Sequence, residues 1–120
     1  MLPEAWIARM QSQLGVEFQA FTLAIQEQVP VSIRINPDKQ LPVDENWLPV
    51  TGNPYGWYLP ERPFFINDPA WHAGAYYVQE AASQLIYLAT KGISPEMVLD
   101  LCAAPGGKTT LLATVFPEAL

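Results

Sequence analysis

L-D-L-C-A-A-P-G-G-K-T-T, from Leu99 to Thr110, is the stretch that decides the fold of this chain. An acidic residue ends an apolar run, a loop of very small residues follows, and Lys-Thr-Thr begins a predicted helix. Small side chains let a ligand approach the main chain, and the N–H groups at a helix start attract anionic groups. The order of strand, tight loop and helix therefore predicts a cofactor site.

A phosphate-binding P-loop is one template for this loop. It requires the pattern G-x-x-x-x-G-K-[ST], and its last three positions align on Gly107, Lys108 and Thr109. Its first glycine would then stand at position 102, where the chain has Cys102. A P-loop nucleotide hydrolase or kinase that binds ATP is disfavoured by this mismatch, and it stays open as an alternative.

The nucleotide-binding turn of a Rossmann-type methyltransferase is the second template, with the pattern acidic-x-small-x-small-x-Gly. Asp100, Cys102, Ala104 and Gly106 fall on its four positions. In such a fold the ligand lies beyond the carboxyl ends of the strands. Asp100 could then meet an ammonium group, while the N–H groups of the loop could meet a carboxylate. S-adenosylmethionine has both groups, and we predict it as the cofactor.

The loop sequence D-L-C-A-A-P-G-G-K-T-T also resembles the cofactor motif of the Sun/Nop (Fmu/Sun) family. These proteins are RNA cytosine-C5 methyltransferases, which install 5-methylcytosine in ribosomal or transfer RNA. Ser32 to Pro37, S-I-R-I-N-P, is similar to the R-x-N element of the family, and Tyr76 to Ser83, Y-Y-V-Q-E-A-A-S, is similar to the element before the cofactor strand. The resemblance covers the chain from about Pro30 onward.

The resemblance implies methyl transfer from S-adenosylmethionine to a cytosine in RNA, and ribosomal rather than transfer RNA as the substrate. It implies a cofactor loop anchored by an acidic residue, with these predicted binding residues: Asp100, Cys102, Ala103, Ala104, Pro105, Gly106, Gly107 and Lys108. Arg34 and Asn36 are predicted to contact RNA, and no metal site is expected. Tyr76, Tyr77 and Gln79 are expected to pack against the strand that leads into the loop.

No catalytic residue is expected within these 120 residues. In the family mechanism one cysteine attacks C6 of the cytosine and a second assists product release, and both stand in later motifs. Cys102 is the only cysteine of the chain. Its place within the cofactor loop predicts a small packing residue that faces the cofactor rather than the target base. We therefore expect an N-terminal fragment that is inactive alone.

Composition limits the possible classes of protein. The chain has 120 residues, of which 50% are hydrophobic, enough for the core of one ordinary domain. A single cysteine, no secretory signal and no apolar run of membrane-spanning length predict a cytoplasmic protein.

The net charge of −6 is unusual for a protein that binds an RNA backbone. Arg34 and Lys39 are the only basic residues close to Asn36, and they could form one small basic spot. A stand-alone RNA-binding module without catalysis is a second alternative, and the acidic balance of the chain counts against it.

Residues 1–72 are predicted to form an α+β region, and the resemblance implies that this region contacts RNA. One helix is expected to end at Gly15, and an apolar stripe from Phe18 to Val29 predicts a second helix that ends before Pro30. Alternation over 31–35 predicts a strand whose Arg34 points away from the core. Prolines are dense from Pro30 to Pro69, which predicts turns joined by short extended pieces, at 57–59 and 64–66 among others.

Residues 73–120 are predicted to begin a Rossmann-like α/β methyltransferase domain with an incomplete sheet. Apolar residues at helical spacing predict a helix over 82–89. The run at 97–101 predicts a parallel strand buried on both faces, and the residues at 111–116 form the apolar face of a following helix. A single strand cannot complete such a sheet, because it needs parallel neighbours.

Overall fold

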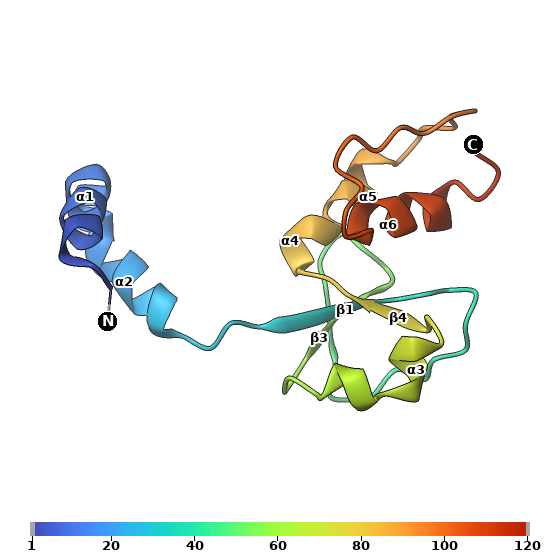
Figure 1. The fold of residues 1–120 in the computed structure, drawn as a ribbon, viewed down its shortest axis with the longest axis horizontal. Helices are drawn as coiled ribbons and strands as arrows, with labels where there is room; N and C mark the ends of the chain where they lie inside the picture. Colours follow the sequence, from blue (N-terminus) through green and yellow to red (C-terminus); the bar gives the residue numbers. More distant parts are fainter. Residues whose placement is uncertain (1, 120) are drawn as a thin grey trace.

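The computed structural model describes residues 2–119 of the chain. Its helices and strands follow one another in the order shown in Figure 1: α1 (Glu4–Leu14), the 3-10 helix η1 (Gly15–Glu17), α2 (Phe18–Gln26), β1 (Val31–Ile35), β2 (Leu48–Pro49), β3 (Gly56–Leu59), the 3-10 helix η2 (Phe65–Asn67), α3 (Pro69–His72), β4 (Tyr76–Val78), α4 (Ala81–Gln84), α5 (Ile86–Ala89) and α6 (Gly107–Val115).

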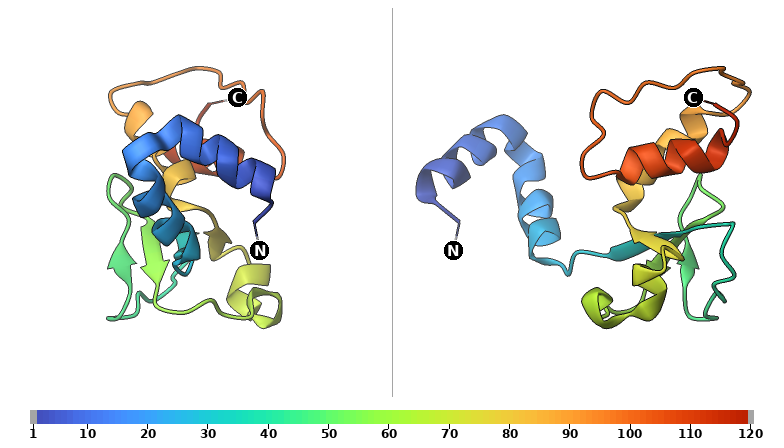
Figure 2. Two further views of the ribbon diagram at one scale, coloured as in Figure 1. Left: turned by 90° about the vertical axis from the view of Figure 1, so that its left-hand side faces the viewer. Right: turned by 45° about the vertical axis from the view of Figure 1, so that its right-hand side comes forward.

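Helices α1 and α2 form a hairpin that stands apart from the rest of the chain, as Figure 1 and the right-hand view of Figure 2 show. Helix α1 ends where expected, at Gly15, whose positive φ of 52° suits a residue without a Cβ atom. The stacked rings of Trp6 and Phe21, with centroids 6.0 Å apart, hold the two helices together. Neither helix has a buried residue.

The four strands form one antiparallel sheet in the order β2-β3-β1-β4. Strand β1 is central, and its Ile33 lies opposite Trp57 of β3 and Val78 of β4. The predicted strand at 31–35 is therefore confirmed, and so is the extended piece at 57–59. Since β4 pairs with β1, the sheet continues beyond residue 72, past the predicted division of the chain.

The apolar core lies on one face of this sheet. Ile33, Ile35 and Tyr76 are its buried residues, with exposed fractions of 1%, 8% and 7%. Partly buried hydrophobic residues from the proline-rich loops and neighbouring strands pack against them: Leu41, Trp47, Trp57, Leu59, Phe65, Ala70 and Val78. The alternation of β1 predicts this face correctly, because every second side chain of a strand points the same way.

Helices lie on both sides of the sheet. Figure 1 shows α3 on one side and α4, α5 and α6 on the other. Helix α3 begins with the side chain of Asp68 accepting a hydrogen bond from the backbone N–H of Ala70. In α6, Leu111 is only 1% exposed and anchors the helix to the neighbouring part of the fold. No helix within residues 2–119 is long and apolar enough to cross a membrane.

The predicted strand at 97–101 is wrong for this structure. The segment has no strand partner within the described residues, and the side chains of Met97, Leu99 and Leu101 are 77%, 81% and 86% exposed. Because the N–H and C=O groups of a strand need a neighbouring strand, an apolar run alone forms none. The Rossmann-like sheet therefore remains a prediction, while the α+β region before it is confirmed.

Three smaller expectations differ from the structure. The second helix ends at Gln26 instead of continuing to the residue before Pro30. Residues 65–67 form a 3-10 helix where an extended piece is predicted. The predicted helix over 82–89 is interrupted at Leu85, which separates α4 from α5. In each case apolar spacing alone does not fix the type of an element or the residue at which it ends.

Candidate cofactor-binding site

The loop between residue 100 and α6 is closed by the side chain of Asp100. Its Oδ1 accepts a hydrogen bond of 2.9 Å from the N–H of Cys102, and its Oδ2 accepts one of 2.7 Å from the hydroxyl of Thr109. The bond from Thr109, followed by that from Cys102, lowers the pKa of Asp100 below its ordinary value. The carboxylate is therefore ionised at neutral pH and ties the start of the loop to helix α6.

Gly106 makes the turn into α6 possible. Its φ of 105° lies in the left-handed region that side chains disfavour, and it stands directly before the first helical residue, Gly107. Because the first N–H groups of an α-helix have no partner within the helix, those of Gly107, Lys108 and Thr109 are free to bind a ligand. The nine-residue helix adds a positive potential at the same end.

The loop is held against the sheet by residues before α4. The hydroxyl of Tyr77 donates a 3.0 Å hydrogen bond to the carbonyl of Pro105, and Nε2 of Gln79 donates a 3.0 Å bond to the carbonyl of Gly107. A Cβ atom at position 107 would lie 3.3 Å from both Gln79 Nε2 and Tyr77 Cε1, so a larger residue would be tightly packed against these two side chains. Tyr77 and Gln79 contact the loop itself, whereas Tyr76 lies in the core on the opposite face.

Arg34 reaches the same place from strand β1. Its Nε donates to Gln79 Oε1 at 2.9 Å and its Nη2 to Thr110 Oγ1 at 2.6 Å, with the carbonyl of Gly107 at 3.5 Å. Only 3% of the residue is exposed, and burial lowers the pKa of its guanidinium. Arg34 points away from the apolar core, as predicted, yet it is buried, because the first turn of α6 and Gln79 cover the polar face of β1.

Asn36 stabilises the turn that follows β1. Its Oδ1 accepts a hydrogen bond from the N–H of Asp38, and its Nδ2 donates to the carbonyl of Gly74. This is the local bonding that favours asparagine in turns. Contact of Arg34 and Asn36 with RNA stays a prediction, and Arg34 would have to leave its internal partners to make it.

Two small hollows flank the loop. One of about 200 Å³ lies between the loop and the segment after β4, and it is lined by Tyr77, Val78, Gln79, Glu80, Ser83, Cys102, Ala104, Pro105, Gly107 and Lys108. The other, of about 270 Å³, lies toward α6 and is lined by Val98, Asp100, Ala103, Thr109, Leu112, Ala113, Phe116 and Ala119. Seven of the eight predicted cofactor residues, all but Gly106, line one of these two hollows. Cys102 is exposed, so its predicted role in packing is not what the structure shows.

The donor set of the loop fits S-adenosylmethionine. Free N–H groups at the start of α6 suit a carboxylate, and the ionised Asp100 suits an ammonium group. Lys108 is exposed beside the loop. Sequence reasoning assigned no role to Thr109 or Thr110, although two threonines at a helix start are a signal of side-chain bonding to nearby groups.

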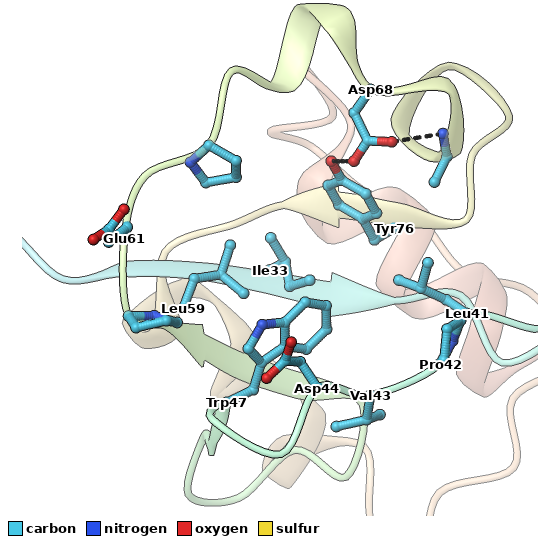
Figure 3. A pocket seen from close by; sticks show the side chains of 13 residues that line it. Ile33, Leu41, Pro42, Val43, Asp44, Trp47, Leu59, Glu61, Asp68 and Tyr76 are labelled. Carbon is cyan, nitrogen blue, oxygen red and sulfur yellow. Dashed lines mark hydrogen bonds between the residues drawn. The ribbon is translucent and has the colours of Figure 1, made fainter.

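A larger pocket lies on the opposite face of the sheet, away from the loop. The pocket has a volume of about 590 Å³ and a mostly apolar lining, to which Asp44, Glu61 and Asp68 add carboxylates. Figure 3 shows Trp47 and Leu59 beside Ile33. The hydroxyl of Tyr76 donates a 2.6 Å hydrogen bond to Asp68, and this bond lowers the pKa of Asp68. Burial, followed by the same bond, raises the pKa of Tyr76. No sequence motif marks this pocket, and it contains none of the predicted site residues.

Residues 2–81 match a family model that describes the N-terminal domain of the 16S rRNA methyltransferase RsmF. The chain belongs to this family. The match spans the α1–α2 hairpin, the sheet and the first residue of α4. The resemblance to RNA methyltransferases of the Sun/Nop type is thereby confirmed.

Relatives of the RsmF family extend the likeness over the loop. Ribosomal RNA small subunit methyltransferase F of Escherichia fergusonii is 34% identical over 131 residues, and that of Citrobacter koseri is 33% identical over the same length. Each alignment covers 92% of this chain and 27% of the relative. The chain thus spans about a quarter of the length of these curated relatives.

A solved structure shares the fold of this RsmF-type chain. The crystal structure of PH0851 superposes on this chain with a TM-score of 0.79 at 29% sequence identity. The superposition covers 98% of this chain and 29% of the PH0851 chain. The arrangement of hairpin, sheet and loop is therefore also found in a second protein.

Proposed function

We propose that this chain is the N-terminal part of a methyltransferase that transfers a methyl group from S-adenosylmethionine to C5 of a cytosine in ribosomal RNA. The observation that carries the proposal is the loop: an ionised Asp100, a left-handed Gly106 and free N–H groups at the start of α6. The RsmF family match and the names of the relatives support the choice of ribosomal RNA.

The residues of the chain have separate tasks in this proposal. The N–H groups of Gly107, Lys108 and Thr109 bind the carboxylate of the cofactor, and Asp100 meets its ammonium group. Cys102, Ala103, Ala104 and Pro105 are small enough to leave the main chain accessible. When bound, the cofactor supplies an activated methyl group. The Rossmann-like domain that would complete the site begins, in this proposal, at residue 73.

A comparison of two ligands tests the proposal. The complete protein that contains residues 1–120 is titrated by calorimetry with S-adenosylmethionine and, separately, with ATP. We expect saturable binding of S-adenosylmethionine and no binding of ATP. Tight binding of ATP without a response to S-adenosylmethionine would overturn the proposal in favour of a P-loop nucleotide-binding enzyme.

A substitution in the loop sharpens this test. Asp100→Asn removes the charge that meets the ammonium group and weakens the closure of the loop, so we expect affinity for S-adenosylmethionine to fall about tenfold or more. Asp38→Asn is the matched control, since Asp38 is an exposed residue in the turn after β1. Equal affinity of the Asp100→Asn variant and the wild type would remove the acidic anchor from the proposal.

A further inference from the structure

A buried arginine joins the sheet to the candidate cofactor loop. Arg34 is 3% exposed, and its acceptors are the neutral oxygens of Gln79, Thr110 and Gly107. Burying a cation opposite neutral groups costs free energy, so the side chain contributes little to stability compared with an apolar one. The role of Arg34 therefore lies in the geometry that its hydrogen bonds impose on their partners.

The side-chain hydrogen bonds of Arg34 connect it to the first turn of α6, directly and through Gln79. The planar guanidinium fixes two directions at once, with Nε bonded to Gln79 at 2.9 Å and Nη2 to Thr110 at 2.6 Å. Gln79 in turn donates its Nε2 to the carbonyl of Gly107 at 3.0 Å. The turn held in this way is the one whose free N–H groups face a ligand in the proposed function.

The position of this turn therefore depends on residues far away in the sequence. Arg34 and Thr110 are 76 residues apart, and Gln79 is 28 residues before Gly107. Gln79 is itself fixed to β1, because its N–H and C=O groups bond with the backbone and the hydroxyl of Ser32. Two side chains, those of Arg34 and Gln79, thus connect β1 to the loop.

We propose that Arg34 is a positioning residue for the cofactor, which sets the orientation of the N–H groups of α6 without touching the cofactor itself. This inference rests on the proposed function. It gives the R-x-N element a task different from RNA contact, since the guanidinium faces inward. The affinity for the cofactor then depends on the two hydrogen-bond directions of the Arg34 guanidinium and not on its charge alone.

Two variants of the complete protein test the inference. Arg34→Lys keeps the positive charge but loses the planar guanidinium that donates in two directions. Thr110→Val removes one of the acceptors of Arg34 with little change in side-chain shape. We expect each to weaken calorimetric affinity for S-adenosylmethionine about tenfold, the scale of one lost hydrogen bond to a charged group. In the ligand-free protein, backbone amides at 103–110 should exchange with deuterium faster than in the wild type.

Thr114→Val is the matched control. Thr114 lies one turn further along α6, and its hydroxyl bonds to the carbonyl of Thr110 as that of Thr110 bonds to Gly106. The control should leave affinity and exchange unchanged. Unchanged exchange of the amides of β1 and β3 in Thr110→Val shows that the sheet is still folded.

Two results would overturn the inference. One is an Arg34→Lys protein that binds S-adenosylmethionine and exchanges its loop amides as the wild type does. The other is a loss of RNA affinity with both of these readouts intact, which would assign Arg34 to RNA contact. Failure of the wild type to bind S-adenosylmethionine overturns the proposed function instead, and amide exchange at 103–110 then still decides whether Arg34 holds the loop.

Discussion

The two faces of strand β1 are buried almost equally, yet by different chemistry. On one face Ile33 and Ile35, at 1% and 8% exposure, pack in the apolar core. On the other, Ser32 and Arg34, at 4% and 3%, are bonded to polar groups from the segments after β4. The apolar face needs only shape, whereas each polar group of the other face needs a specific partner.

The polar face is organised around Gln84 of helix α4, which is fully buried. Its Nε2 donates to the carbonyls of Ile33 and Gln79, and its Oε1 accepts from Nδ2 of Asn53. The space for it exists because position 56 is a glycine, where a Cβ atom would overlap the Gln84 amide. No buried side-chain nitrogen or oxygen among the described residues lacks a hydrogen-bond partner. A polar interior of this kind fixes one arrangement of sheet, α4 and α6.

The largest effect is expected on the apolar face. Ile33→Ala removes three carbon atoms from the centre of the core, and we expect the free energy of unfolding of the sheet to fall by about 4 kcal/mol. Native-state amide exchange in β1 and β3 of the complete protein measures this change. Ile93→Ala, at a residue 56% exposed, is the control and should stay within about 0.5 kcal/mol of wild type. A smaller loss of unfolding free energy in Ile33→Ala than in Gln84→Leu would contradict the comparison of the two faces of β1.

A smaller effect is expected on the polar face. Gln84→Leu keeps the volume of the side chain but leaves Nδ2 of Asn53 without its acceptor and removes one donor each from the carbonyls of Ile33 and Gln79, which should cost about 2 kcal/mol. The same amide-exchange measurement applies, with Gln11→Leu on the exposed side of α1 as control. An unchanged or raised free energy of unfolding would show that the polar network adds specificity and no stability.

The smallest effect concerns Asp68 at the edge of the apolar face, and it depends on pH. Its pKa is lowered in the folded protein by the bond from Tyr76, so its contribution to stability is complete above the ordinary aspartate pKa of about 3.9. That contribution is lost as the pH falls through the lower pKa of the folded state. We expect Asp68→Asn to lose less stability than the wild type between about pH 4 and pH 2, measured by thermal unfolding. Parallel pH profiles would contradict this assignment.

Much of the fold and of the candidate site could be predicted from local sequence. The end of α1 at Gly15, the alternation of β1 and the turn at Gly106 each depend on residues within a few positions of one another. The cofactor loop was recognised in the same way, from spacing between Asp100 and Gly106. The contacts of Tyr77, Gln79 and Thr110 around that loop could not be predicted in this way. The spacing of residues along the chain carries no information about which distant segments meet.

The sequence by itself determined that the first helix ends at Gly15, that residues 31–35 form a strand, which face of β1 is apolar and where a small-residue loop precedes a helix. Only the tertiary structure decided that the polar face of β1 is buried too, because α6, some 76 residues away, covers Arg34. It also decided that residues 97–101 form no strand within the described chain, although their composition favours one. The physical reason is the same in both cases. Local geometry follows from neighbouring residues, whereas burial and strand pairing require a partner surface supplied from elsewhere in the molecule.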